Sequence, residues 1–431
     1  MIKKILAHLL FLPNFFIPIG VAHVETFPHA TLFSINRKTT LPLAYVLILV
    51  LFAISAVLTF VDYGQGMSVL RSYLAIVNAT LIFYRVLYVD REDYDLIVKA
   101  LFTVLAANIF IAALQRTGTL PGFLYDLLTV FIPRMSEETM GSGRGVTGLY
   151  PEPAYTAYAM HYIFAFVFVV TRLHPFKGPG IWLLALVFLW DIVITRSVTD
   201  IILLSAYLAG YITWKNLPGL LGFAAALLGV ALLYAEYGTD VPRSLQFVHN
   251  VFFTWNTDTW TTLINESGYR FVTVYGGYLY GLVHPLGGGI GSYIVTSVPS
   301  LEMTGIDSFE LYYYLEANEG HYIVTRPSSV GSALFLEAGI IGTAAFLVAY
   351  TMGITRWDWV RIPQGRAVLT LYVFNFLFLG TIGDPVPAAV LALCYVTFTK
   401  FDSDYVKDLD DLKTAANTEG KSLGLKSSAT P

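Results

Sequence analysis

The chain has 431 residues, of which 56% are hydrophobic and 13% are charged, and its mean hydropathy is +0.63. This composition leaves too little polar surface to cover a water-soluble globule of that size. The net charge of −4 gives no general basic field, which argues against a nucleic-acid partner. The single cysteine, Cys394, excludes an intrachain disulfide framework and a cysteine-based metal cluster. The composition therefore predicts a membrane protein.

Apolar stretches that suit a hydrocarbon core of about 30 Å recur along nearly the whole chain. The first covers residues 5–24 and is interrupted by Pro13 and Pro18. Further helices are predicted over residues 41–62, 67–88, 96–114, 154–172, 180–195, 199–214, 218–235, 330–354, 366–381 and 385–399. We therefore expect an all-α polytopic membrane protein with about 10–12 transmembrane helices.

Basic residues mark one side of these predicted helices. They are Arg172, Lys177, Lys215, Arg356, Arg361, Arg366 and Lys400. Because short cytoplasmic loops are enriched in lysine and arginine, this side is predicted to be cytoplasmic. The chain then divides into N-terminal transmembrane helices (1–235, with an outer loop near 115–153), a large periplasmic loop (236–329), C-terminal transmembrane helices (330–400) and a disordered cytoplasmic tail (401–431).

The first segment does not fit this orientation. Lys3 and Lys4 precede it, and Arg37 and Lys38 follow it. Both pairs are expected on the cytoplasmic side, although only one candidate span separates them. A hairpin broken by proline or a re-entrant segment would reconcile the two pairs.

The first motif that suggests chemistry runs from Arg144 to Tyr155. Arg144 and Glu152 bracket a turn rich in glycine and proline at the mouth of a predicted helix. Pro153 suits a first helical turn, and a carboxylate is favoured beside the helix dipole, so an ordinary helix start explains Glu152 alone. It does not explain Arg144, or the glycines that permit close approach of a backbone. We therefore favour a pocket that both charges face.

The second motif is the polar turn around Arg196, which places a cation away from the basic side. Contact with lipid phosphate and pairing with Asp191 or Asp200 are the structural explanations. Binding of a ligand's phosphate is the functional explanation, and the spacing alone does not separate them.

The predicted outer loop contains three arginines, Arg243, Arg270 and Arg326, and no lysine. The planar fork of arginine holds phosphate oxygens bidentately, so an arginine-only set fits diphosphate recognition. The loop is also rich in carboxylates, so salt bridges are the competing explanation. Arg243 is the arginine that we expect to be structural.

A glycine-rich run from His284 to Ser292 offers backbone amides that suit a phosphate, but it is a weak signal alone, and a flexible loop beside the membrane is the commoner cause of such a composition. Aromatic residues of the same loop fit either a membrane interface or the apolar faces of a sugar ring. The histidines of the loop, at 249, 284 and 321, are widely separated and lack paired ligand spacing. We therefore expect no metal site.

Four segments carry a resemblance to a known family. They are Gly148 to Tyr155, Thr195 to Ser197, Arg270 with His284 to Leu286 and then Gly289 and Gly291, and Ser328 to Gly342. Together they look like the O-antigen polymerase and ligase superfamily, over roughly residues 140–345. The Pro-Glu-Pro segment resembles polymerases. Ligases typically place a histidine before the last of these helices, where this chain has Arg326 with His321 nearby, so the ligase alternative stays open.

The resemblance implies a metal-independent glycosyltransferase of GT-C architecture without a cofactor. Its donor and acceptor would be oligosaccharides linked to undecaprenyl diphosphate, and its product an O-antigen, capsule or exopolysaccharide. It would lie in the bacterial inner membrane, among membrane lipid, with its active site facing the periplasm. A chain-length regulator protein is a candidate partner. A polysaccharide or glycolipid transporter is the alternative of another class, but its charges should lie within helices rather than in outer loops.

The resemblance and the motifs together nominate ten residues. We expect catalytic roles for Glu152, Arg196, Arg270, His321 and Arg326. We expect Arg144, Tyr155, His284, Gly289 and Ser328 to bind substrate. The arginines would stabilise the departing diphosphate, and Glu152 or His321 would accept the proton of the attacking hydroxyl.

Overall fold

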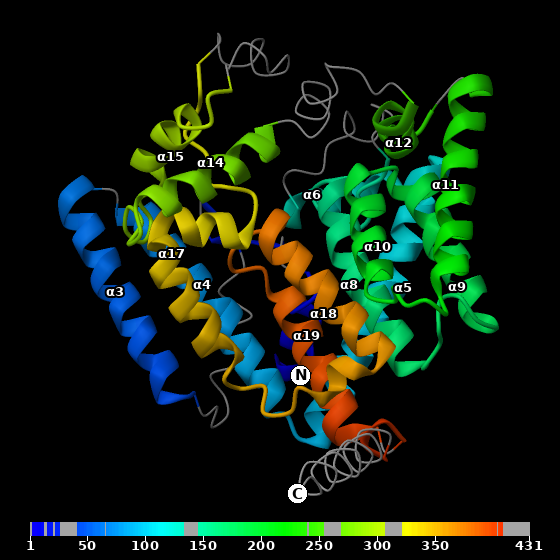
Figure 1. Cartoon of the computed structure of the whole chain (residues 1–431), viewed down its shortest axis with the longest axis horizontal. Coiled ribbons are helices and arrows are strands. Elements are labelled where there is room, and N and C mark those ends of the chain that lie inside the picture. Colours follow the sequence, from blue (N-terminus) through cyan, green and yellow to red (C-terminus); the bar gives the residue numbers. More distant parts are fainter. Residues whose placement is uncertain are drawn as a thin grey trace, which may run out of the picture.

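The computed structural model describes residues 2–12, 15–19, 22–25, 41–64, 66–132, 145–238, 241–253, 269–306, 321–402 and 404–407. These residues are mainly helical, and the helices run between two ends of the molecule (Figure 1). Five helices are long and apolar enough to cross a membrane: α3 (Leu43–Tyr63), α4 (Gly66–Leu87), α5 (Arg91–Thr117), α8 (Pro153–Val170) and α17 (Val330–Thr351).

Other helices lie among these five. They are α1 (Ile2–Leu9), α6 (Gly122–Phe131), α9 (Pro179–Leu189) continued by η1 (Trp190–Thr195), α10 (Val198–Ala209), α11 (Leu217–Tyr237), α18 (Pro363–Phe378) and α19 (Pro385–Val396) continued by η4 (Thr397–Phe401). The ten helices predicted after the first segment are confirmed as helices. Within the described part of the chain, five rather than 10–12 have the length and hydropathy of a full span.

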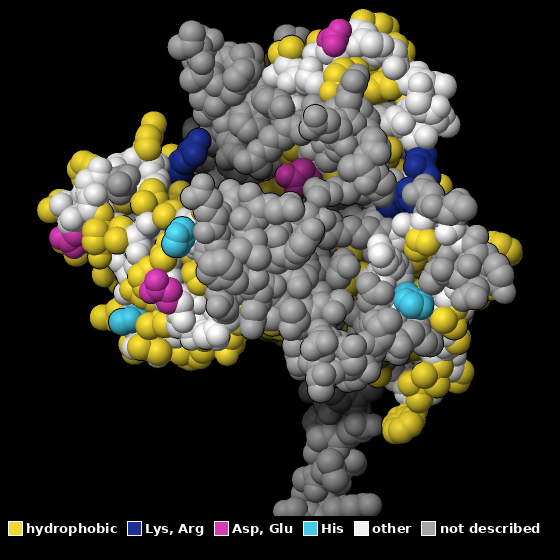
Figure 2. Space-filling view, turned by 90° about the horizontal axis from the view of Figure 1, so that it is seen from above, with side chains coloured by type: hydrophobic (Ala, Val, Ile, Leu, Met, Phe, Trp, Pro, Cys, Tyr) yellow, Lys and Arg dark blue, Asp and Glu magenta, His cyan; other side chains and the backbone are white. Residues whose placement is uncertain are grey.

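Helix α3 illustrates why the molecule suits a membrane. Its outward face exposes Leu47, Val50, Leu51 and Val61, whereas Phe52 on the opposite face is buried. A continuous apolar face of this kind is unfavourable in water and favourable against lipid tails. Figure 2, seen from the end that carries α14 (Tyr269–Val283) and α15 (Tyr293–Glu302), shows hydrophobic side chains along the flanks of the molecule.

Helices α8 and α19 form the centre. All residues of α19 are buried, and α19 packs against α4, α8 and α18. A helix that is apolar on all sides is stable only when other helices surround it. The N-termini of these two helices are therefore held by a rigid core.

The first segment does not form a single span. Helix α1 is followed by a hairpin in which β1 (Phe16–Ile19) pairs antiparallel with β2 (Ala22–Glu25). Lys3 contacts Asp93 at the start of α5. The single span considered over residues 5–24 is therefore wrong, and a hairpin, the alternative considered, is present. Arg37 and Lys38 lie outside the described residues.

The large connection predicted over residues 236–329 contains helices of its own. Helix α12 (Arg243–Phe253) packs against α11, and α14 packs against α15 and α17. The described parts of the connection thus form helices that cover one end of the bundle (Figure 1).

Helix α17 breaks at Gly339, where φ is 66° and ψ is −178°. The glycine-rich run satisfies the carbonyl groups that the break leaves without helical partners. The amide of Gly288 donates to the oxygen of Leu336, and the distance is 2.9 Å. The amide of Gly289 donates to the oxygen of Glu337, also at 2.9 Å. These two amides are therefore engaged within the protein rather than turned toward a ligand.

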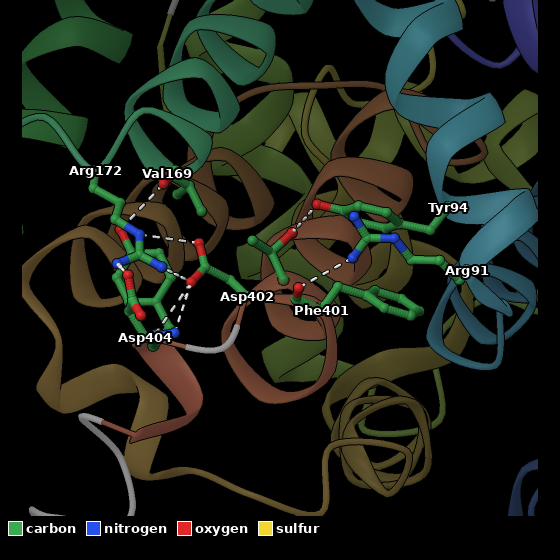
Figure 3. A network of polar contacts seen from close by, with 9 residues as sticks. Arg91, Tyr94, Val169, Arg172, Phe401, Asp402 and Asp404 are labelled. Atoms are coloured by element: carbon green, nitrogen blue, oxygen red, sulfur yellow. Dashed lines mark hydrogen bonds and ion pairs between the residues drawn. The ribbon is translucent and has the colours of Figure 1, made fainter.

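The opposite end of the molecule contains a polar network (Figure 3). The guanidinium of Arg172, at the end of α8, contacts the carboxylates of Asp402 and Asp404 and lies over the ring of Tyr405. Tyr405 is buried. The first residues of the predicted disordered tail are therefore packed against α8, and residues 408–431 lie outside the described part.

Candidate functional site

An open pocket lies where α14 meets the ends of the central helices. Its atom-free space, which is continuous with solvent, measures about 470 Å³. Its lining comes from several separate parts of the chain: Ala154, Tyr155, Tyr158, Thr199, Arg270, Ser328, Leu379, Gly380, Thr381 and Asp384. Lys400 and Arg172, two of the basic residues predicted to be cytoplasmic, lie at the opposite ends of α19 with η4 and of α8.

Four helices begin at this pocket, and the described part of a fifth, α14, starts there as well. Ala154, Thr199 and Arg270 are the second residues of α8, α10 and α14. Ser328 lies two residues before α17, and Asp384 directly precedes α19. Because the N-terminus of a helix carries about half a unit of positive charge, this arrangement gives the pocket a potential that suits an anion.

Glu152 and Arg270 meet at the mouth of the pocket. Glu152 is the N-cap residue of α8, but its side chain makes no capping hydrogen bond. Its Oε2 atom lies instead 3.5 Å from Nη2 of Arg270, and both side chains are partly exposed. The ordinary capping role therefore does not account for Glu152. Arg270 presents five N–H groups, so a pairing this loose leaves donors for a ligand.

The turn before Glu152 is positioned by close backbone contacts. The amide of Gly148 donates to Oε1 of Gln115 on α5 at 2.7 Å. Gly145 passes so near η1 that a Cβ atom there would lie 1.9 Å from the oxygen of Thr195. The glycines thus bring the first two motifs together. Arg144, expected to bind substrate, lies outside the described residues.

Arg196 occupies a left-handed conformation, with φ of 52°, between η1 and α10. Its amide donates to the main-chain oxygen of Asp191 at 2.9 Å, and the residue is buried. A positive φ is uncommon outside glycine and indicates that surrounding packing imposes the turn. The pocket lining includes Thr199, one turn further along, rather than Arg196 itself.

Arg326 and Ser328 face different surroundings. Ser328 lines the pocket and its hydroxyl donates to the main-chain oxygen of Arg270 at 3.5 Å. Arg326 instead directs Nη2 to Oε1 of buried Glu337 at 2.9 Å and lies over the ring of Tyr293. This environment is that of a structural ion pair, and it differs from the catalytic position expected for Arg326.

The remaining predicted residues do not line the pocket. His284 follows the far end of α14, about 20 Å from Arg270 along a helix of that length, and its ring packs on that of Tyr280. Gly289 lies against Thr59 of α3. His321 is exposed. The structure therefore gathers Tyr155, Arg270 and Ser328 in the pocket lining and Glu152 beside Arg270.

Asp384 is a pocket residue that the sequence did not suggest. One carboxylate oxygen accepts the amide of Val386 at 2.9 Å, and burial raises the pKa of the carboxyl group to about 7. Asp384, Thr381 and Tyr158 also line a second, deeper pocket among α4, α8, α17 and α18. An aspartate followed by proline before an apolar stretch is typical of a helix start, which conceals its place in the pocket.

The pocket combines three kinds of chemistry. Arg270 and the helix N-termini favour an anion, Glu152 and Asp384 are candidate proton acceptors, and Tyr155 and Tyr158 offer aromatic rings. Comparison of the chain with protein-family models, with curated proteins and with solved structures gave no match.

Proposed function

We propose that this protein is a membrane glycosyltransferase of the GT-C type that polymerises a polysaccharide. It transfers a glycan from an undecaprenyl-diphosphate carrier onto a lipid-linked repeat unit at the periplasmic face of the bacterial inner membrane. The observation that carries this proposal is the convergence of four helix N-termini and Arg270 on one pocket. Such an arrangement suits the diphosphate of the donor, both bound and departing.

In the proposed reaction, a hydroxyl oxygen of the acceptor sugar bonds to the anomeric carbon of the donor. The bond between that carbon and the diphosphate oxygen breaks, and the diphosphate leaves with the electron pair. Arg270 and the helix N-termini stabilise the negative charge that develops on it. The hydroxyl proton passes to a carboxylate, and Glu152 is our assignment because it lies 3.5 Å from Arg270 and is open to solvent.

The placement of polar groups favours an outward-facing site over a translocation path. The basic residues that identify the cytoplasmic side lie at the opposite ends of the helices that begin at the pocket. This relation supports a periplasmic position for the pocket. The rings of Tyr155 and Tyr158 line it and suit the apolar faces of sugars.

The test is to incubate the purified, detergent-solubilised protein with its lipid-linked oligosaccharide repeat unit, without metal or nucleotide, and to resolve the products by size. We expect a ladder of longer lipid-linked glycans, which Glu152→Gln should abolish. Transfer that requires a different acceptor would favour a ligase. Unchanged native substrate with folded protein would overturn the proposal.

The matched control for this assay is Asp95→Asn. Asp95 is also a partly exposed carboxylate paired with an arginine, Arg91. It lies in the first turns of α5, whereas Gln115 at the last turn of α5 is the residue that contacts the turn before Glu152. This variant should keep the ladder, because its effect on charge is the same and its place is remote from the pocket. Equal loss in both variants would show that Glu152 has no special role.

A further inference from the structure

Three buried side chains from three different elements meet inside the bundle. They are His161 of α8, Asp191 of η1 and Asp200 of α10. Nε2 of His161 lies 3.4 Å from Oδ2 of Asp191, and Nδ1 of His161 lies 3.2 Å from Oδ1 of Asp200. Nδ1 also donates to the main-chain oxygen of Ala157 at 2.9 Å, so Nε2 is the nitrogen that is available to an ion. One ligating atom from each residue lies within 4.8 Å of the others. His161 is not one of the three loop histidines on which the expectation of no metal site rested.

The carboxylate of Asp191 is not satisfied by the protein groups around it. Neither of its oxygens has a well-aligned hydrogen-bond partner among the described residues, and the same is true of Nε2 of His161. Both side chains are almost wholly buried. Buried polar atoms normally have a hydrogen bond, and a buried charge without a partner is costly. The atoms thus point at one another around a place for a cation.

The charge count leads in the same direction. If both carboxylates are ionised, their two negative charges exceed the single positive charge of an imidazolium. A divalent cation bound by the neutral imidazole and both carboxylates balances the three side chains. The ligating atoms of a tetrahedral zinc site lie about 3.3 Å apart, close to the separation of His161 from Asp191.

We propose that His161, Asp191 and Asp200 form a binding site for one divalent transition-metal ion. One imidazole nitrogen and two carboxylate oxygens are donors that suit Zn²⁺, which we take as the first candidate. The ion joins α8, η1 and α10 inside the bundle and is structural.

This site lies behind the wall of the pocket. Thr199 of the pocket lining directly precedes Asp200, and Tyr158 lies one turn before His161 on α8. The side chain of Thr195 donates to Asp200. The metal therefore fixes the left-handed turn at Arg196. It is not a participant in glycosyl transfer, and the inference stands independently of the proposed function.

The test uses the full chain, purified with an affinity tag that contains no histidine. Metal content is measured by mass spectrometry before and after chelation, and the chelated protein is titrated with Zn²⁺ and with Co²⁺ while absorption and melting temperature are followed. We expect about one ion per chain, a visible Co²⁺ absorption band and a higher melting temperature with metal.

Two variants and one control make the test specific. His161→Gln and Asp191→Asn should lose the ion and the absorption band, whereas His174→Gln, in the loop between α8 and α9, should retain both. Folding is checked by size-exclusion chromatography. If folded wild-type protein binds no stoichiometric metal and melts identically with and without it, the cluster holds a shared proton and the proposal is wrong. Equal binding in wild type and both variants would overturn it as well.

Discussion

Two arginine–glutamate pairs in the molecule differ in distance and in exposure to solvent. In the pair at the pocket, Arg270 and Glu152 lie 3.5 Å apart, and their side chains are 49% and 39% exposed. In the second pair, beside Gly291 of the glycine-rich run, Arg326 and Glu337 lie 2.9 Å apart, and their side chains are 19% and 0% exposed. The first pair is looser and more accessible, and the second is closer and largely buried.

Under the proposed function, burial rather than residue type distinguishes the arginine that binds substrate from the one that stabilises the fold. Glu337 also has a second contact, because its Oε2 accepts a hydrogen bond from the amide of Gly291 at 2.9 Å. An exposed pair contributes little to stability and leaves donors free for a ligand. A buried pair is costly to break, because the remaining charge has no partner.

The largest effect is expected from breaking the buried pair. Arg326→Ala leaves the carboxylate of Glu337 buried without its cation, which should destabilise the protein by about 3–5 kcal/mol. Thermal or denaturant unfolding of the detergent-solubilised protein measures the loss of stability. Size-exclusion chromatography of the same preparation checks that the variant is folded.

A double variant sharpens this prediction. Arg326→Met combined with Glu337→Gln removes both charges while the glutamine oxygen still accepts the amide of Gly291. It should recover much of the lost stability. If Arg326→Ala instead remains as stable as the wild type and is inactive, the catalytic role expected from the sequence is right and the structural role is wrong.

The next effect is expected at the exposed pair, and on activity rather than stability. Arg270→Ala should lower the rate of glycan transfer by about 100- to 1000-fold, because a preorganised donor to the departing diphosphate is lost. The melting temperature should change little, since exposed pairs contribute under about 1 kcal/mol. Initial rates and melting curves of the same preparation measure both quantities.

Arg91→Ala is the matched control for Arg270→Ala. Arg91 is also exposed and pairs with a carboxylate, Asp95, at 3.2 Å, but it lies at the other end of the bundle. The Arg91→Ala variant should keep its rate of glycan transfer. Loss of stability and activity together in Arg270→Ala would mean that the two pairs do not differ as proposed.

The sequence predicts some parts of the fold better than others. The long apolar stretches predict the helices well, because lipid imposes both length and hydrophobicity. Helices α12, α14 and α15 were missed, since they are shorter, lie in the polar connection and owe their place to packing on other helices. The break at Gly339 was also missed, because an isolated glycine in an apolar run does not reveal a positive φ.

The candidate site was predictable only where residue type was informative. Glu152 and Arg270 could be found because charges are rare in this chain. The sequence placed Arg326 in the same group, since it does not show that Glu337 is buried beside it. His161 and its two aspartate neighbours come from three separate apolar stretches, so no spacing connects them before the chain folds.

Asp384 extends the comparison into the pocket, where a carboxylate is buried without an arginine. Burial raises its pKa from 3.8 to about 7, so the folded protein holds its proton more tightly than the unfolded chain. The stabilisation by the proton is complete below about pH 4 and is lost as the pH rises through about 7, by up to about 1.4 kcal/mol per pH unit.

Asp384→Asn removes this titration and keeps an oxygen for the amide of Val386. Its stability should therefore vary less than that of the wild type between about pH 5 and pH 8. Unfolding curves at a series of pH values measure the difference. Parallel pH profiles for the two proteins would show that Asp384 does not titrate in this range.

The smallest effect is expected at Arg172, at the other end of the molecule from the pocket. Its guanidinium contacts two carboxylates, Asp402 and Asp404, but all three side chains are reached by solvent (Figure 3). By the rule drawn from the two arginine–glutamate pairs, exposure should outweigh the number of contacts. Arg172→Ala should cost under about 1 kcal/mol, less at high salt, and leave glycan transfer unchanged. A loss of several kcal/mol on unfolding would show that exposure alone does not decide what an ion pair contributes here, and that the ring of Tyr405 beneath the guanidinium must be counted.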